Sequence, residues 1–291
     1  MAGTREIKRR VKSIKSTQQI TRAMKMVSAA KLRRAQDRAL AARPFAFKLQ
    51  EILTSVAENT KHVAHPLLAS RKVKNVAVIV MTSDRGLCGG FNTNTIKQAR
   101  QLLDIKKDCK IELLTVGRKA FDFFKRREYP IRSSHIGLPD NIPFLTAKEI
   151  AQTAMVGYEK GEFDEVYLIY GKFVSAMNQI PTTVKLLPLD SGNLKGAKEP
   201  GLKCEYLYEP SPEDILSTLL PKYVEILIYQ TLLESKASEH GARMVAMGSA
   251  TDNAGEMIDK LTLMFNRARQ ASITKEIAEI VGGAEAMAGG S

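Results

Sequence analysis

The sequence predicts an α/β domain combined with a long α-helical coiled coil, in which antiparallel N- and C-terminal helices flank a small Rossmann-like sheet. Apolar residues recur every three or four positions near both ends of the chain. Strand-like and helix-like runs alternate between Lys72 and Glu209. The N-terminal segment is basic and the C-terminal segment mildly acidic, which favours their pairing. We therefore expect a coiled-coil helix over residues 1–65, the α/β domain over 72–209, and a second coiled-coil helix over 210–291.

The N-terminal helix is expected from about Thr4 to Thr60. Thr4 is a candidate N-cap, and Pro44 should kink or break the helix near Arg43, because proline removes a backbone donor and clashes one turn back. A narrow apolar stripe is expected at Ile7, Val11, Ile14, Ile20, Met24 and Val27. Such a stripe needs a partner helix to bury it.

The central region is expected to form four strands and three helices. Val76–Met81 is a continuous apolar run typical of a strand covered on both faces. Thr146 and Glu149 form a capping box that should open a helix. A surface loop is expected over Asp190–Gly201. The expected strands are 76–81, 111–116, 166–170 and 183–187, and the expected helices are about 93–103, 119–125 and 146–158.

The C-terminal helix is expected from about Ser211 to Val281. Ser211 can cap it and Pro212 suits its first position. Gly282 and Gly283 should end it. At ~1.5 Å per residue such a helix would be roughly 105 Å long, too long for the interior of one globular core.

Charge is concentrated at the N-terminus of a chain whose formal net charge is +13. Residues 1–43 hold thirteen Lys or Arg and two acids, whereas residues 211–291 hold seven Lys or Arg and eleven acids. The basic run fits a solvated face, an acidic protein partner or nucleic acid. Nucleic-acid binding would weaken steeply with salt. The first aromatic residue, Phe45, follows the basic run, which counts against stacking on single strands.

Cysteine and histidine usage predicts no metal site. Cys88, Cys109 and Cys204 are scattered and include no CxxC pair, which fits a reducing compartment. His62 and His65 are close in sequence but have no neighbouring Cys or acid. No apolar run approaches the ~20 residues of a membrane-spanning helix. The Arg-rich N-terminus has some likeness to a transit peptide, but its periodicity continues past a plausible cleavage point.

The glycine-rich turn Ser83–Asn92 follows the first expected strand, where a phosphate-binding loop would lie. Its glycines, at 86, 89 and 90, match neither dinucleotide nor phosphate-loop spacing, and Gly117-Arg118 follows the second strand without a ribose-binding acid. These features favour a tight packed turn over a dinucleotide enzyme. Glu276 and Glu279 share a helix face, where partner contact or solvation is favoured over acid–base chemistry. No catalytic or cofactor-binding residue is predicted.

Several stretches resemble the gamma subunit of F-type ATP synthases, and the resemblance runs from Gly3 to Gly283. They are Ile20–Val27 (ITRAMKMV), Ser83–Gly90 (SDRGLCGG), Ala242–Met247 (ARMVAM), Asn266–Thr274 (NRARQASIT), and the C-terminal run Ile273-Thr274-x-Glu276 with Ile280 and Gly283-Ala284. The last two stretches overlap at Ile273-Thr274 and count as one. Four separated motifs in this order are specific, and the start at the helix itself is typical of bacterial members.

The resemblance implies a central rotor shaft that is not itself catalytic and has no cofactor. Its implied partners are the alpha and beta subunits, with one such chain per head of three alpha and three beta subunits, together with the epsilon subunit and the membrane c-ring. Nucleic acid and a small-molecule substrate are not implied. The implied location is the cytoplasmic face of the bacterial membrane, as a peripheral protein.

By motif match, two groups of residues are expected to make contacts. Rotor–stator and coiled-coil contacts are expected from Met24, Lys25, Arg243, Arg269, Gln270, Thr274 and Glu276. An apolar tip that turns in an apolar sleeve is expected from Ile273, Ile277, Ile280 and Val281.

Overall fold

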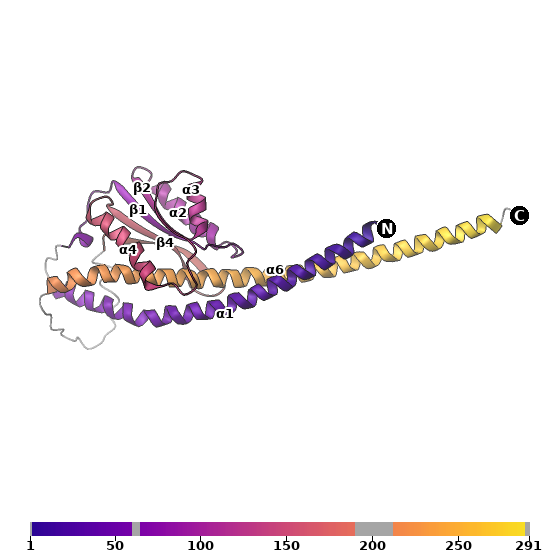
Figure 1. Cartoon of the computed structure of the whole chain (residues 1–291), viewed down its shortest axis with the longest axis horizontal. Helices are drawn as coiled ribbons and strands as arrows, with labels where there is room; N and C mark the ends of the chain where they lie inside the picture. The colour runs from indigo at the N-terminus through magenta and orange to yellow at the C-terminus, as the bar shows by residue number, and fades with distance from the viewer. Residues whose placement is uncertain (1, 60–64, 190–211, 289–291) are drawn as a thin grey trace. The chain divides into compact units, whose positions relative to one another are not determined.

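The computed structural model describes residues 2–59, 65–189 and 212–288 (Figure 1). Ser211, the expected loop Asp190–Gly201, His62 and Cys204 lie outside the described residues. The chain divides into two compact units, one made of Met1–Val27 with Met244–Ser291 and the other of Ser28–Arg243. Two helices, α1 (Ala2–Asn59) and α6 (Pro212–Ala288), contribute to both units. We call the first the terminal unit and the second the sheet unit.

The sheet unit contains a five-stranded sheet of order β3-β2-β1-β4-β5. Its strands are β1 (Asn75–Met81), β2 (Lys110–Val116), β3 (Ile131–His135), β4 (Glu165–Phe173) and β5 (Gln179–Leu187). Neighbours pair in parallel, except that β5 runs antiparallel to β4. The mostly parallel sheet is thus confirmed. The short edge strand β3 was not expected, because its sequence IRSSH has no apolar run.

Helices cover both faces of this sheet (Figure 1). They are α2 (Phe91–Ile105), α3 (Arg118–Lys125) and α4 (Phe144–Glu159), with a short 3-10 turn, η1, at Pro66–Leu68. The capping box predicted at Thr146 is wrong, because α4 begins earlier, with Pro143 as its N-cap. Thr146 instead lies inside the first turn, where its N–H donates to the Pro143 carbonyl.

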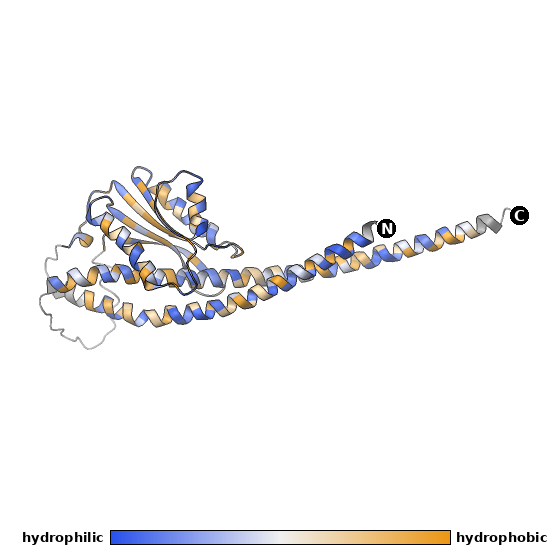
Figure 2. Ribbon diagram, in the orientation of Figure 1, coloured by the Kyte–Doolittle hydropathy of each residue, from blue (hydrophilic) through white to orange (hydrophobic). Residues whose placement is uncertain are grey.

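Strand β1 is buried on both faces, as its unbroken apolar run predicts (Figure 2). Val76, Val78 and Val80 pack against α2 and α3. Ala77 and Ile79 face a larger core that also includes buried residues of α4, α1 and α6. In the sheet unit, therefore, residues 28–59 of α1 and 212–243 of α6 form part of the same core as the sheet.

Pro44 does not break α1, which rules out one of the two expected outcomes, since the helix continues from Ala2 to Asn59. An internal proline costs about 3 kcal/mol. The turns that follow bury Ala46, Leu49 and Leu53 in the core. Full burial of each leucine contributes about 1.5–3 kcal/mol, which offsets the proline. The helix also begins at Ala2, so Thr4 is inside it and is not its N-cap.

Gly282 and Gly283 do not end α6, which continues to Ala288. Each costs about 1 kcal/mol relative to alanine in a helix, but neither removes a hydrogen bond. A glycine ends a helix when it adopts the left-handed conformation, and no positive φ occurs at these two residues.

Candidate functional site

The terminal unit is an antiparallel pair formed by the first part of α1 and the last part of α6. Its seam follows alternating spacings of three and four residues, as in a coiled coil. The side chains that are buried or half-buried include Ile7, Val11, Ile14, Gln18, Thr21 and Met24 on α1, and Met247, Thr251, Ala254, Ile258, Leu261, Phe265 and Ala268 on α6.

The expected stripe is wrong at two positions, Ile20 and Val27, which are 57% and 54% exposed. Continuing the spacing from Ile14 leads to Gln18 and Thr21, and the structure places these polar residues in the seam. Helix geometry therefore decides which side chains face α6, even where the exposed neighbours are more apolar.

Polar atoms meet across this seam around Thr251. The hydroxyl oxygens of Thr21 and Thr251 are 2.8 Å apart. The Gln18 side-chain amide donates to the Thr251 carbonyl at 3.4 Å. These contacts favour one register, because a slip by one turn would break the hydroxyl contact between the two helices.

Met24 and Lys25 follow directly along α1. Met24 is half-buried, whereas Lys25 is exposed. The end of the Lys25 side chain lies over Gly248 of α6, so that a Cβ added to Gly248 would stand 3.5 Å from both Cε and Nζ. Gly248 thus leaves room for Lys25 to cross α6 with its ammonium group at the surface.

The last part of α6 extends beyond its partner helix (Figure 1). Since Lys25 lies at Gly248 and Gln18 at Gly255, the same register brings the start of α1 to about Gln270. Every described side chain from Ile273 to Ala284 is exposed. The four residues of the expected apolar tip are among them: Ile273 is 47% exposed, Ile277 56%, Ile280 71% and Val281 50%.

The predicted polar contact residues Arg269, Gln270, Thr274 and Glu276 are also exposed. The Arg269 guanidinium lies 6.0 Å from the Phe265 ring centre. Glu276 accepts a hydrogen bond from the Ser272 hydroxyl at 3.3 Å. Both contacts are made within α6, so the solvent-facing sides of Arg269 and Glu276 are open to another protein.

Arg243 is placed differently, in the sheet unit, and is 9% exposed. Its guanidinium pairs with Glu239 at 2.9 Å and donates to the Gly86 carbonyl at 3.3 Å. A weaker contact reaches the Arg85 carbonyl at 3.5 Å. The polar contacts that the structure shows for Arg243 are therefore internal, and they attach the glycine-rich turn to α6.

That turn presents carbonyl oxygens to α6, which is the wrong polarity for a phosphate cradle. It is held by its own side chains: the Ser83 hydroxyl donates to the Arg85 carbonyl at 2.6 Å, and Asn92 accepts from the Ser83 N–H at 2.9 Å. Leu87 adopts a left-handed conformation, with φ 61°. The turn is thus packed by internal contacts.

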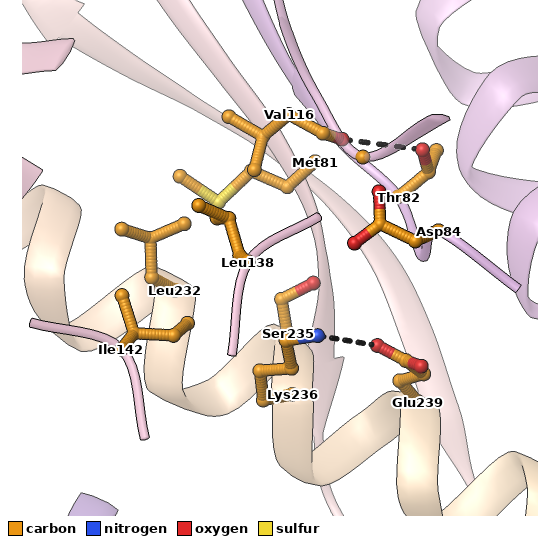
Figure 3. A pocket seen from close by; sticks show the side chains of 11 residues that line it. Met81, Thr82, Asp84, Val116, Leu138, Ile142, Leu232, Ser235, Lys236 and Glu239 are labelled. Carbon is orange, nitrogen blue, oxygen red and sulfur yellow. Dashed lines mark hydrogen bonds and ion pairs between the residues drawn. The ribbon is translucent and has the colours of Figure 1, made fainter. Parts of the chain in front are cut away.

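Helix α6 also occupies the crevice where doubly wound sheets bind ligands, beyond the carboxyl ends of the parallel strands. Figure 3 shows Leu232, Ser235 and Glu239 of α6 facing Met81 and Val116, at the ends of β1 and β2. The cavity left among these residues has a volume of about 10 Å³, which is room for at most one water molecule. A dinucleotide does not fit there.

Neither a metal-binding cluster nor a membrane span is found in the part of the chain that the structure describes. No three His, Cys, Asp or Glu residues in residues 2–59, 65–189 and 212–288 are grouped to hold an ion. Within the same ranges, no helix combines the length and apolar character needed to cross a bilayer.

Comparison with known proteins assigns a family to this arrangement. The family model described as ATP synthase matches residues 3–287. The ATP synthase gamma chain of Pelotomaculum thermopropionicum is 54% identical over 287 residues, covering 99% of this chain and 100% of that one. The gamma chain of Heliobacterium modesticaldum is also 54% identical, over 293 residues and the same shares.

Solved structures show the same fold. A chain in the central stalk and c-ring of the Tetrahymena thermophila mitochondrial ATP synthase is 31% identical, with a TM-score of 0.61, and the match covers 79% of this chain and 99% of that one. A chain of the Euglena gracilis mitochondrial ATP synthase is 19% identical, with a TM-score of 0.70 and coverage of 98% and 95%, which supports the fold alone. From the family model and the curated relatives together, this chain belongs to the gamma-chain family of the ATP synthases.

Proposed function

We propose that this chain is the central shaft of an F-type ATP synthase, which carries rotation between the membrane c-ring and the catalytic head of alpha and beta subunits. It performs no catalysis itself. The observation that carries this proposal is the unpaired end of α6, where four large apolar side chains stand exposed on one helix. A contiguous apolar surface of this kind marks a contact with another protein.

The mechanism follows from the shape and chemistry of the terminal unit. A two-helix coil resists twisting more than a single helix does, so it transmits an angle along its length. The shaft can bias a catalytic subunit only through contact free energies that differ between that subunit's conformations. A shaft with different side chains on each side, such as Lys25 and Ile20 on different faces of α1, presents a different surface to each catalytic subunit in turn.

The exposed tip suits a bearing. Apolar side chains such as Ile277 and Ile280 make contacts without fixed hydrogen bonds, so sliding past an apolar sleeve breaks no directional bond. The basic N-terminal part of α1, in contrast, suits acidic loops of the beta subunits. Lys25 and the residues around it are thus assigned to the charged part of the shaft.

Individual residues are assigned accordingly. Met24 and Lys25 contact beta-subunit loops, and Arg269, Gln270, Thr274 and Glu276 make polar contacts with the head. All of these except Met24, which is half-buried, are exposed. Arg243 contributes indirectly, through its internal contact with the glycine-rich turn.

The remaining partners are the epsilon subunit and the c-ring, which would contact the sheet unit. The chain then lies at the cytoplasmic face of a bacterial membrane as a peripheral protein. The related Tetrahymena thermophila chain belongs to a central stalk and c-ring, which supports the c-ring as a partner.

Affinity purification of the tagged chain at low detergent tests the proposal. Recovery of about three alpha and three beta subunits per chain is expected, from the stoichiometry of the head. Two rival functions predict other results. A nucleic-acid-binding coil would retain nucleic acid at low salt and release it at high salt. A dinucleotide enzyme would give heat on titration with NAD or ATP.

A further inference from the structure

One loop of the sheet unit touches both long helices. This loop, residues 136–143, joins β3 to α4. The Asp140 carboxylate pairs with Lys31 of α1 at 2.8 Å and contacts His240 Nε2 of α6 at 3.2 Å. The Asp140 carbonyl also accepts from Arg38 of α1 at 2.9 Å. A single residue therefore bridges α1 and α6.

The second contact of Asp140 is a close approach of its carboxylate to His240 Nε2, at 3.2 Å. The side chain of His240 is 4% exposed, and burial lowers its pKa, so the ring is neutral at pH 7. Burial alone would raise the pKa of Asp140, but Lys31 and the other nearby cations outweigh it and hold that pKa below its usual value.

The loop is in turn tied to the glycine-rich turn through Asp84. The Asp84 carboxylate accepts from the Gly137 N–H at 3.0 Å and from the Arg118 N–H at 2.9 Å. The glycine-rich turn holds Arg243, one turn along α6 from His240. The glycine-rich turn, residues 83–92, and the loop 136–143 thus form one connected structure at the carboxyl edge of the sheet. We call these two loops the collar.

We propose that Asp140 fastens the two helices to the sheet, and that torque passes between the sheet and the shaft through this collar. The inference rests on the proposed function of the chain as a shaft. Apolar contacts in the core hold the helices against the sheet, and the Asp140 carboxylate adds a polar contact to each helix, to Lys31 of α1 and to His240 of α6. Asp140 acts as a positioning residue for both helices.

The contacts of the Asp140 carboxylate contribute little to the free energy of unfolding, so a variant that lacks them can be tested as a folded protein. Asp140 and Lys31 are 44% and 40% exposed, and ion pairs of this kind contribute little to stability. A variant that removes the carboxylate should fold normally and differ only under load. We therefore choose Asp140→Asn as the test, with Asp140→Glu as the conservative rescue.

Arg132→Gln is the matched control. It removes ion pairs with Glu162 and Glu112 and a contact with the Phe163 ring, and none of these residues belongs to either long helix. A bead can be attached through Lys107→Cys, an exposed position in the turn after α2, once Cys109 and Cys204 are replaced by serine. The complex with alpha and beta subunits is fixed to a surface through the head.

The measurement is the angular variance of the bead during pauses between steps at low ATP. For Asp140→Asn we expect the angular variance to rise roughly two-fold. Without its charge, residue 140 holds Lys31 and His240 only weakly, so the loop is detached from the helices for much of the time. Arg132→Gln and Asp140→Glu should stay at the wild-type variance, and unloaded ATP hydrolysis should be unchanged in all.

If the angular variance of Asp140→Asn equals that of Arg132→Gln, Asp140 does not hold the helices to the sheet. Faster amide hydrogen exchange in the loop would not rescue the proposal, because it reports only local opening of the loop. The proposed function fails in a different way: the wild-type bead would then not rotate on addition of ATP.

Discussion

At the scale of residues, the seam of the terminal unit depends on a few polar contacts. Thr21 is 8% exposed, and its hydroxyl lies 2.8 Å from that of Thr251. Both hydroxyls also contact carbonyls of their own helices, at Gln18 and Met247. Polar pairs of this kind fix register in coiled coils.

Thr251→Val should lower the free energy of unfolding of the chain by about 1 kcal/mol, because the Thr21 hydroxyl loses its partner on the other helix. Denaturant unfolding gives the value. Thr262→Val is the control, since Thr262 is exposed and its hydroxyl bonds only to its own helix, at Ile258. If Thr251→Val and Thr262→Val lower the free energy of unfolding equally, the Thr251 hydroxyl has no special role in the register of the seam.

Met24→Lys should weaken coupling between proton flow and ATP synthesis. Met24 is half-buried beside the exposed Lys25, so a second ammonium would be placed at a packed position next to an existing positive charge. The readout is the number of protons pumped per ATP hydrolysed in membrane vesicles. Met26→Lys serves as the control, because Met26 is 68% exposed. Unchanged coupling in Met24→Lys would show that Met24 has no such role.

At the scale of elements, the turn after β2 depends on one glycine. Gly117 has a φ of 88°, and a Cβ there would stand 2.2 Å from the Thr82 carbonyl oxygen. Because the neighbour is backbone, it cannot move aside without shifting the end of β1.

Gly117→Ala should therefore lower the free energy of unfolding by roughly 3 kcal/mol or more, from strain and displaced backbone together. Gly137→Ala isolates the strain, because Gly137 also has a positive φ, of 76°, but nothing lies within 4 Å of its Cβ position. It should cost about 1 kcal/mol. The expectation is wrong if the two variants unfold at the same denaturant concentration.

The sheet also contributes a pH dependence. Burial alone would raise the pKa of Glu165, but hydrogen bonds from Lys106 and Lys185 outweigh it, so the pKa is below the ordinary value of 4.5. A lowered folded-state pKa gives stability that is complete above pH 4.5 and is lost as pH falls through the folded-state value. In Glu165→Gln, the free energy of unfolding should depend less on pH below pH 4.5 than it does in the wild type. A profile parallel to wild type would contradict the assignment.

Elements differed in how far the sequence predicted them. Strand β1 was predictable, because a strand covered on both faces needs an unbroken apolar run. Strand β3 was not, since an edge strand buries little. The expected stripe in α1 included Ile20 and Val27 because they are apolar, whereas the helical period placed Gln18 and Thr21 in the seam. Local rules also predicted a kink or a break at Pro44, and the helix is not broken there because tertiary burial outweighs the local cost.

At the scale of the whole molecule, the contacts that matter most join residues far apart in sequence. Arg243 and Gly86 are an example: the spacing of the glycines argued against nucleotide binding, but nothing local showed that α6 would fill the crevice instead. Asp140 likewise lies in a loop without a recognisable sequence motif, and only the fold brings Lys31 and His240 to it. The spacing of the isoleucines near the end of α6 was visible in the sequence, but an apolar tip at these residues was expected only from the family resemblance.

Removal of residues 273–288 should separate folding from function. Every described side chain from Ile273 to Ala284 is exposed, so the shortened chain should unfold at nearly the wild-type temperature. Assembled with alpha and beta subunits, it should develop less torque against a viscous load, because the shaft loses its bearing. A large fall in unfolding temperature would mean that this end of α6 is packed within the chain.

The central claim is that this chain turns within a catalytic head. Its most direct test fixes the head to a surface, attaches a bead to the sheet unit through Lys107→Cys and supplies ATP. Our account predicts that the bead rotates in one direction, with three pauses per turn for a head of three catalytic beta subunits. A bead that stays at one angle while the same complex hydrolyses ATP would contradict it.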